Sequence, residues 1–147
     1  MDMVTMDEIL TNSDFISVHV PRKPGTPALL GSSAFAKMKK GVLILNCARG
    51  EIVNTNDMVA ALKSGQVGGY GTDVLDQEPP PADHPLLKLP NVVITPHVGS
   101  RTYESVVRQA TCAVKNLIFA MNGEKPIAQV NPEVPVKKAF LKKPCPN

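Results

Sequence analysis

The chain has 147 residues, 43% of them hydrophobic, which is enough for one domain with a buried core. Its formal net charge of +3 arises at the carboxyl-terminal end, because residues 131–147 hold four lysines and one glutamate while the remainder is neutral. A neutral body excludes the broad basic surface of a nucleic-acid-binding protein.

A short helix and a strand are predicted first. Thr5 and Glu8 have the spacing of a capping box, so a helix should begin there and run through Leu10. Residues 15–20 are rich in β-branched and aromatic side chains, which favours a strand with His19 close to its carboxyl end.

A second helix and the most apolar strand follow. Ser32 or Ser33 can cap a helix over residues 34–40. Residues 42–45 are all apolar without polar alternation, which predicts a central strand covered on both faces. Arg49 then lies where that strand ends and the chain turns.

The next predicted elements are a helix and a glycine-rich strand. The helix runs over residues 54–64, with an asparagine as N-cap and Gly65 as its stop. The strand covers residues 69–75 and carries Asp73 near its end, and Glu78 follows shortly after.

A proline-rich loop leads to the last strand and helix. Prolines 79–81 keep the chain extended, and we interpret His84 in this loop as solvent-exposed. Residues 91–95 predict a fourth strand, and His97 follows it. Residues 102–122 predict a long helix with an apolar stripe at helical spacing.

The alternation of strands and helices predicts an α/β protein with a parallel sheet. Four polar residues then fall at the carboxyl ends of its strands, namely His19, Arg49, Asp73 and His97. Ligands of open α/β sheets bind outside that edge, so these residues are candidates for a functional site.

Each candidate has a structural alternative. The Arg49 guanidinium can hold a small carboxylate through two parallel hydrogen bonds, or it can be a surface arginine paired with an acid such as Glu51. His97 can act as a general acid and base beside the Glu78 carboxylate, or it can be a structural histidine. Asp73 can instead cap the end of its strand.

Several motifs carry a resemblance to a known family. In order they are SDFISVHVP, MKKGVLILNCARGEIV, ALKSGQVGGYGTDVLDQEPPP and HPLLKLPNVVITPHVGS. From about Leu10 to Val130 the chain resembles the second half of the nucleotide-binding domain of the D-isomer-specific 2-hydroxyacid dehydrogenases, in the phosphoglycerate, hydroxypyruvate and glyoxylate branch. Formate dehydrogenases have a glutamine where this chain has Glu78, which favours the hydroxyacid branch.

The resemblance implies a fold and a division of the chain. Residues 1–130 are expected to form the nicotinamide half of a Rossmann-like doubly wound parallel sheet, with helices on both faces. Residues 131–147 are expected to form a flexible tail rich in proline and lysine. The GxGxxG turn that precedes this region in the family is absent, and so is the family's substrate domain.

The resemblance also implies roles for individual residues. Arg49 would bind the substrate carboxylate, Glu78 would pair with His97, and His97 would be the acid and base. Asp73 would contact the nicotinamide amide. Arg49 and His97 are also expected to lie against the cofactor. The family contacts the rest of the cofactor largely through backbone, here at Val20, Cys47, Ala48, Val98, Gly99 and Ser100.

The function implied is an NAD-dependent oxidoreductase that acts on the CH–OH group of a D-2-hydroxy acid, with NADP as the alternative cofactor. The contrasting hypothesis is a catalytically inactive fragment that acts as a binding or assembly module. The expected partners are a small 2-keto or 2-hydroxy acid and a second chain, either another copy or one that supplies the missing half.

The three cysteines of the chain form no CxxC pair, so neither a disulfide framework nor a metal site is expected. The amino-terminal residues lack the basic and apolar segments of a signal peptide. We therefore expect a soluble, cytoplasmic protein with neither nucleic acid nor membrane as partner.

Overall fold

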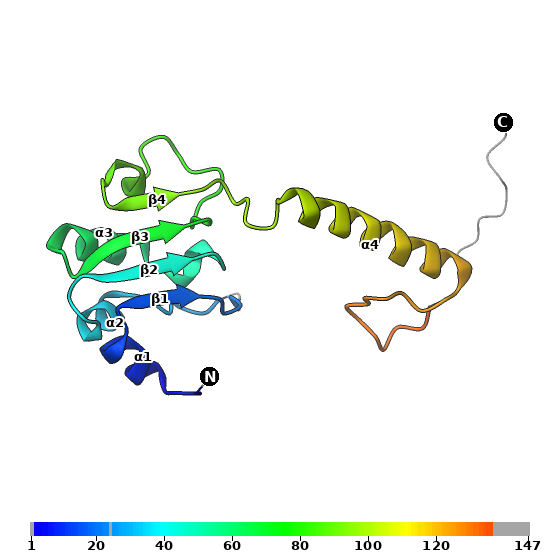
Figure 1. Ribbon diagram of the computed structural model, residues 1–147, viewed down its shortest axis with the longest axis horizontal. Coiled ribbons are helices and arrows are strands. Elements are labelled where there is room, and N and C mark those ends of the chain that lie inside the picture. Colours follow the sequence, from blue (N-terminus) through cyan, green and yellow to red (C-terminus); the bar gives the residue numbers. More distant parts are fainter. Residues whose placement is uncertain (1, 24, 137–147) are drawn as a thin grey trace. The chain divides into compact units, whose positions relative to one another are not determined.

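The structure is a computed structural model that describes residues 2–23 and 25–136. It divides into two compact units, Met1–Gly99 and Ser100–Asn147, and each is described by itself. The first unit contains a parallel sheet with its helices, and the second contains one long helix (Figure 1).

The sheet of the first unit has four strands in the order β1-β2-β3-β4, all parallel, and their arrows point the same way in Figure 1. The register places Ile44 between Ile16 and Tyr70 on neighbouring strands. The α/β prediction with a parallel sheet is confirmed. The strands are β1 Phe15–Val18, β2 Val42–Asn46, β3 Val67–Thr72 and β4 Val92–Ile94.

Helix α1 precedes the first strand, and two further α-helices and two short 3-10 helices connect the strands. They are α1 Met6–Asn12, α2 Ser32–Lys37, η1 Gly50–Ile52, α3 Thr55–Ser64 and η2 Pro85–Lys88. The predicted capping box of Thr5 and Glu8 is present at α1. Asn54 caps α3 by accepting a hydrogen bond from the Asp57 amide, and Gly65 ends that helix at a φ of 73°.

The predicted start of α2 is wrong. Gly31 is the N-cap and makes no side-chain capping bond, so neither Ser32 nor Ser33 has that role. The Ser32 amide instead donates to Asp57 Oδ2 at 2.8 Å, which supplies an acceptor from the neighbouring helix α3. The helix also ends earlier than the predicted range of residues 34–40.

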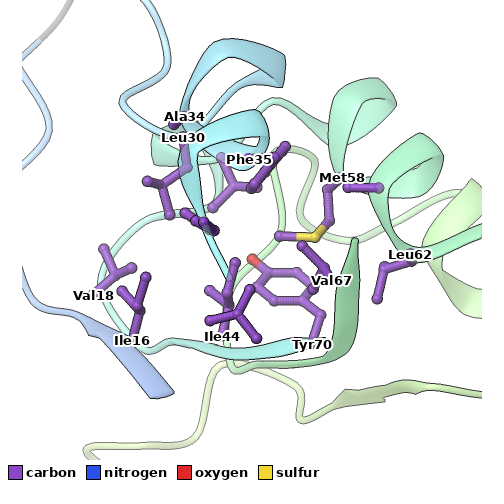
Figure 2. Packing of buried hydrophobic residues seen from close by; sticks show 14 of the residues in the cluster. Ile16, Val18, Leu30, Ala34, Phe35, Ile44, Met58, Leu62, Val67 and Tyr70 are labelled. Atoms are coloured by element: carbon purple, nitrogen blue, oxygen red, sulfur yellow. The ribbon is translucent and has the colours of Figure 1, made fainter. Parts of the chain in front are cut away.

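One hydrophobic core joins the helices to the sheet. Ile16, Ile44 and Tyr70 point from three strands toward Phe35 of α2 and Met58 of α3 (Figure 2). Helix α1 and the 3-10 helix η2 add one leucine each to the same cluster. All the helical elements of this unit that share the core therefore cover the same face of the sheet.

Within this unit, the helices leave apolar side chains exposed on the opposite face of the sheet. Leu43 and Leu45 of β2 are 38% and 48% exposed, and Phe15 and Val93 on the outer strands are 70% exposed. Burial alternates along β2, so the prediction that residues 42–45 are covered on both faces is wrong for this unit. An apolar run shows that both faces of a strand are suited to burial, but burial also requires another segment to pack on each face.

The second unit is built on helix α4, Tyr103–Asn122, as predicted. The Thr102 hydroxyl accepts a hydrogen bond from the Ser105 amide, and Gly123 ends the helix at a φ of 79°. The apolar stripe of α4 is at least half exposed at Val107, Val114, Leu117 and Ile118.

No helix of the described residues has the length and apolar character needed to cross a membrane. Most of the expected tail, residues 131–147, lies outside the described residues.

Candidate active site

The four polar residues expected at the carboxyl edge are all found there. His19 and Asp73 directly follow β1 and β3, and Arg49 and His97 come three residues after the ends of β2 and β4. His19 does not join the others, because its Nε2 atom lies 2.7 Å from the hydroxyl of Ser17 on its own strand. The candidate site is therefore built from β2, β3 and β4.

The centre of the site is a histidine and carboxylate pair. His97 Nδ1 lies 2.7 Å from Glu78 Oε2, and Glu78 Oε1 accepts a hydrogen bond from the Leu75 amide at 3.0 Å. The hydrogen bond with His97, together with that from Leu75, holds the pKa of the Glu78 carboxyl below its usual value. The other ring nitrogen, Nε2, has no protein partner among the described residues. The predicted pairing is present, with one ring nitrogen left for a ligand.

Arg49 lies beside this pair. A hollow of about 330 Å³ is lined by Arg49, His97 and Glu78 together with neighbouring residues that include Glu51 and Asp76. Among the described residues, the guanidinium donates one hydrogen bond, to the Ala48 carbonyl at 2.7 Å. Within residues 2–23 and 25–136 it forms no ion pair, so the alternative pairing with Glu51 is not seen. A cationic donor and a histidine thus face one small cavity.

The turn that carries Arg49 is held in place by Asn46, the fully buried last residue of β2. The Asn46 amide nitrogen donates to the Arg49 carbonyl at 2.9 Å, and its oxygen accepts from the Ala48 amide at 3.0 Å. The same nitrogen lies 3.3 Å from the hydroxyl of Tyr70. The sequence analysis missed Asn46, although a polar residue that ends an apolar strand was a signal for it.

Gly50 brings two parts of the site together. A Cβ atom at this position would lie 2.2 Å from the carbonyl oxygen of Leu75 and 2.3 Å from the amide nitrogen of Asp76. Only glycine lets the backbone after β2 approach the backbone after β3 this closely. The turn with Arg49 is thereby packed against the segment that leads to Glu78.

Asp73 organises the loop that carries His97. Its Oδ1 accepts from the Thr95 hydroxyl and from the Val98 amide at 2.9 Å, and its Oδ2 accepts from the Gly99 amide at 2.8 Å. Burial raises the pKa of the Asp73 carboxyl, but these three hydrogen bonds outweigh it and hold the pKa below its usual value. His97 has a φ of 52°, a left-handed conformation that this anchoring supports.

Asp73 thus bonds to the segment after β4 rather than capping the end of its own strand, and this arrangement leaves room for a ligand. A carboxylate offers about four lone-pair sites, of which Asp73 uses three. Asp73 and His97 also line an apolar hollow of about 400 Å³ with Leu75, Ile94 and Pro96. A flat, largely apolar ring that carries an amide fits this combination of an apolar surface and a hydrogen-bond acceptor.

The remaining cofactor candidates of the first unit lie in its carboxyl-edge loops. Val20 and Val98 are 44% and 39% exposed, Cys47 is exposed with a free thiol, and Ala48 is partly buried. Their exposure fits a ligand that lies along the edge. Ser100 begins the second unit, where its carbonyl accepts a hydrogen bond from the Gln109 side chain.

His84 is not solvent-exposed, so that prediction is wrong. Only 3% of the residue is accessible, and its Nε2 lies 3.0 Å from Asp76 Oδ1. It becomes buried because the 3-10 helix η2 begins immediately after it and inserts Leu86 into the core. Burial raises the pKa of the Asp76 carboxyl, but hydrogen bonds from His84 and Thr55 outweigh it and leave the pKa below its usual value.

Comparison with known proteins adds a family to this geometry. Residues 1–99 match the family model described as D-isomer specific 2-hydroxyacid dehydrogenase, NAD binding domain. The glyoxylate reductase of Thermofilum pendens is 44% identical over 134 residues, which are 91% of this chain and 40% of the relative. The glyoxylate/hydroxypyruvate reductase B of Citrobacter koseri is 44% identical over 129 residues, 88% of this chain and 40% of the relative.

A solved structure agrees with the sequence matches. The D-lactate dehydrogenase of Lactobacillus jensenii, crystallised with NAD⁺, has a TM-score of 0.80 and 32% identity. The match covers 86% of this chain and 42% of the solved chain. The chain therefore spans about 40% of the length of the curated relatives it matches.

Proposed function

The chain belongs to the D-isomer-specific 2-hydroxyacid dehydrogenases, glyoxylate/hydroxypyruvate branch, and we propose that it carries the nicotinamide half of the active site of an NAD-dependent oxidoreductase. The substrate class is a small 2-keto acid or the corresponding D-2-hydroxy acid, as the names of the relatives suggest. The observation that carries the proposal is the His97–Glu78 pair beside the guanidinium of Arg49.

Arg49 holds the substrate in this proposal. The planar guanidinium binds the carboxylate of a 2-keto acid through two parallel hydrogen bonds. Because Asn46 fixes the backbone on both sides of this residue, the cation is presented from a rigid turn. Binding at the carboxylate places the neighbouring C2 carbonyl within the same hollow as His97.

His97 moves the proton. In the direction of reduction, its Nε2 donates a proton to the C2 oxygen as hydride arrives at C2, so a C–H and an O–H bond form and the C=O π bond is lost. Glu78 accepts from Nδ1 and stabilises the imidazolium before the transfer. In the reverse direction Nε2 takes the hydroxyl proton.

The cofactor supplies the hydride when it is bound. Asp73, through its remaining lone-pair site, is the acceptor proposed for the nicotinamide amide, and the backbone at Val20, Cys47, Ala48, Val98, Gly99 and Ser100 is proposed to line the rest. NADP stays an alternative, since the chain lacks the acidic residue that follows the GxGxxG turn and distinguishes the two cofactors.

A chimera tests the function. The matching segment of the Thermofilum pendens glyoxylate reductase is replaced by this chain, and NADH oxidation by glyoxylate is followed. His97→Ala and Glu78→Gln should lower kcat by roughly 10²–10⁴ with little change in NADH affinity. Arg49→Ala should chiefly raise KM for the keto acid. A His97→Ala chimera as fast as its parent would refute the assignment, with the Asp14→Asn chimera as a surface control.

A second function has some support. The sheet has exposed apolar side chains on one face, which fits a catalytically inactive binding or assembly module. The chimera separates the two proposals. An inactive chimera that folds, shown by circular dichroism, and binds NADH would favour the module.

A further inference from the structure

We propose that His84 is a positioning residue for the Glu78–His97 pair and that it acts through Asp76. The inference rests on the proposed function, because it concerns the same pair, and it adds a residue to which the family resemblance gave no role. It is carried by the hydrogen bond from a buried histidine to the carboxylate two residues before Glu78.

The first step concerns the loop between β3 and η2. Glu78 projects from this loop, and three prolines follow it at positions 79–81. The hydrogen bond between His84 and Asp76 joins two residues eight positions apart, so the segment between them, which includes Glu78, forms a closed loop. Closing a short loop removes much of its conformational freedom. The backbone at Glu78 is thus confined from both ends.

The second step concerns Asp76. Its Oδ1 accepts a hydrogen bond from His84 Nε2 at 3.0 Å, and the Thr55 side chain, at the start of helix α3, also lowers the pKa of the Asp76 carboxyl. Its backbone lies against Gly50, where no Cβ could be accommodated. Asp76 therefore ties the loop to α3, to the turn after β2 and, through His84, to η2.

The third step connects this anchor to the pair. Glu78 Oε1 accepts from the Leu75 amide, so the side chain is held by the residue directly before Asp76. Any movement of the Leu75–Asp76 backbone would move both carboxylate oxygens relative to His97. A 2.7 Å contact between two partly exposed side chains needs such support to persist.

His84 itself is suited to this role. It is 3% exposed and packs where η2 enters the core, so its ring cannot turn toward water. Its Nδ1 atom is buried and has no hydrogen-bond partner among the described residues. A buried polar atom without a partner destabilises the fold. A histidine that leaves Nδ1 without a partner is explained if its Nε2 is required for the hydrogen bond to Asp76.

The test uses the intact 147-residue chain and needs neither cofactor nor turnover. His84→Gln can keep an amide donor near the position of Nε2, whereas His84→Asn places its amide nearer Nδ1 and cannot reach Asp76. The carboxyl groups of Glu78 and Asp73 are titrated by carbon NMR, and exchange of the Leu75 amide is measured. The other charged groups around the pair are Arg49, Glu51, Asp73 and Asp76, and all four stay unchanged in these variants.

In His84→Asn we expect the low pKa of Glu78 to rise toward its usual value and the Leu75 amide to exchange on the order of tenfold faster, as loss of about one hydrogen bond predicts. His84→Gln should stay close to the wild type. Asp73 is the internal control, because its partners Thr95, Val98 and Gly99 do not involve this loop.

An unchanged pKa of Glu78 in folded His84→Asn would overturn the proposal. Equal pKa shifts at Glu78 and Asp73 would also overturn it, because they would show that the whole site, and not the loop alone, had become less ordered. If His84→Asn does not fold, Asp76→Asn is the second variant, and slow Leu75 exchange there would overturn the proposal. A dehydrogenase assay that fails leaves these measurements intact, so the two proposals can fail separately.

Discussion

Replacement of Asp73 by asparagine should destabilise the first unit by an amount that the structure allows us to derive. Asp73 is 7% exposed and its two carboxylate oxygens accept three hydrogen bonds, from Thr95, Val98 and Gly99. Asparagine has nearly the same shape but offers one oxygen and one NH₂ group. The change therefore tests the hydrogen bonds rather than the packing.

The magnitude follows from the orientation of the new amide. If its oxygen takes the place of Oδ1, the bonds from Thr95 and Val98 persist without charge, while the NH₂ group meets the Gly99 amide, also a donor. Loss of one hydrogen bond to a charged group costs about 1.5–3 kcal/mol, and weakening the other two adds about 1 kcal/mol. We expect a loss of about 3 kcal/mol of unfolding free energy at neutral pH, a large part of a typical stability.

Urea denaturation of the variant and the wild type measures this loss. Asp14→Asn is the matched control, because Asp14 makes one exposed contact with Lys39 at 3.0 Å and should contribute at most about 1 kcal/mol. The pH dependence gives a second check. Folding lowers the pKa of Asp73, so its contribution is complete above the usual value near 4 and is lost as pH falls through the lower, folded pKa.

The difference between wild type and Asp73→Asn should therefore shrink below about pH 4. A loss of unfolding free energy under about 0.5 kcal/mol at neutral pH would show that the three hydrogen bonds stabilise the fold less than such bonds usually do. A large difference that stays constant down to about pH 2 would show that ionisation of Asp73 is not its source.

Three further predictions concern the turn after β2, the cofactor and the open sheet. Gly50→Ala should destabilise the unit by at least about 2 kcal/mol in urea denaturation, because its Cβ would overlap the Leu75 carbonyl, and a neutral result would show that the turns are not in close contact. Calorimetry should find NADH dissociation from the isolated chain no tighter than about 1 mM, since few contacts remain without a GxGxxG turn, and micromolar binding would contradict this. Strand β1 is an outer strand of the sheet with Phe15 exposed, so light scattering should show association that grows with concentration; a strict monomer whose residues 15–18 resist hydrogen exchange would refute this.

The strand ends were predictable from the sequence, because a parallel sheet has one carboxyl edge. Once residues 15–20, 42–45 and 91–95 were recognised as strands, the polar residues after them had to lie at the same edge. That argument needs no side-chain contact. It does not by itself separate His19, which turns back to Ser17, from the histidine that faces Glu78.

Burial was the property that sequence reasoning predicted least well. His84 lies between prolines in a polar loop, so it was expected in solvent, whereas the 3-10 helix that follows carries it inside. The apolar residues 42–45 were expected to be covered twice, and one face is open. In both cases the outcome depends on how the segment packs against the rest of the fold, which local composition does not describe.

Three carboxylates follow strand β3 within six residues, and their partners separate their roles. Asp73 binds amides of the loop after β4, Asp76 binds His84, and Glu78 binds His97. Asp73 holds a backbone segment and Asp76 meets a buried histidine, whereas Glu78 meets a partly exposed histidine that lines the same hollow as Arg49. These anchors all lie within residues 1–99, the region that matches the family's NAD binding domain. The contact between His97 and Glu78 is thus formed entirely by groups of this region, which is why its geometry can be tested without turnover.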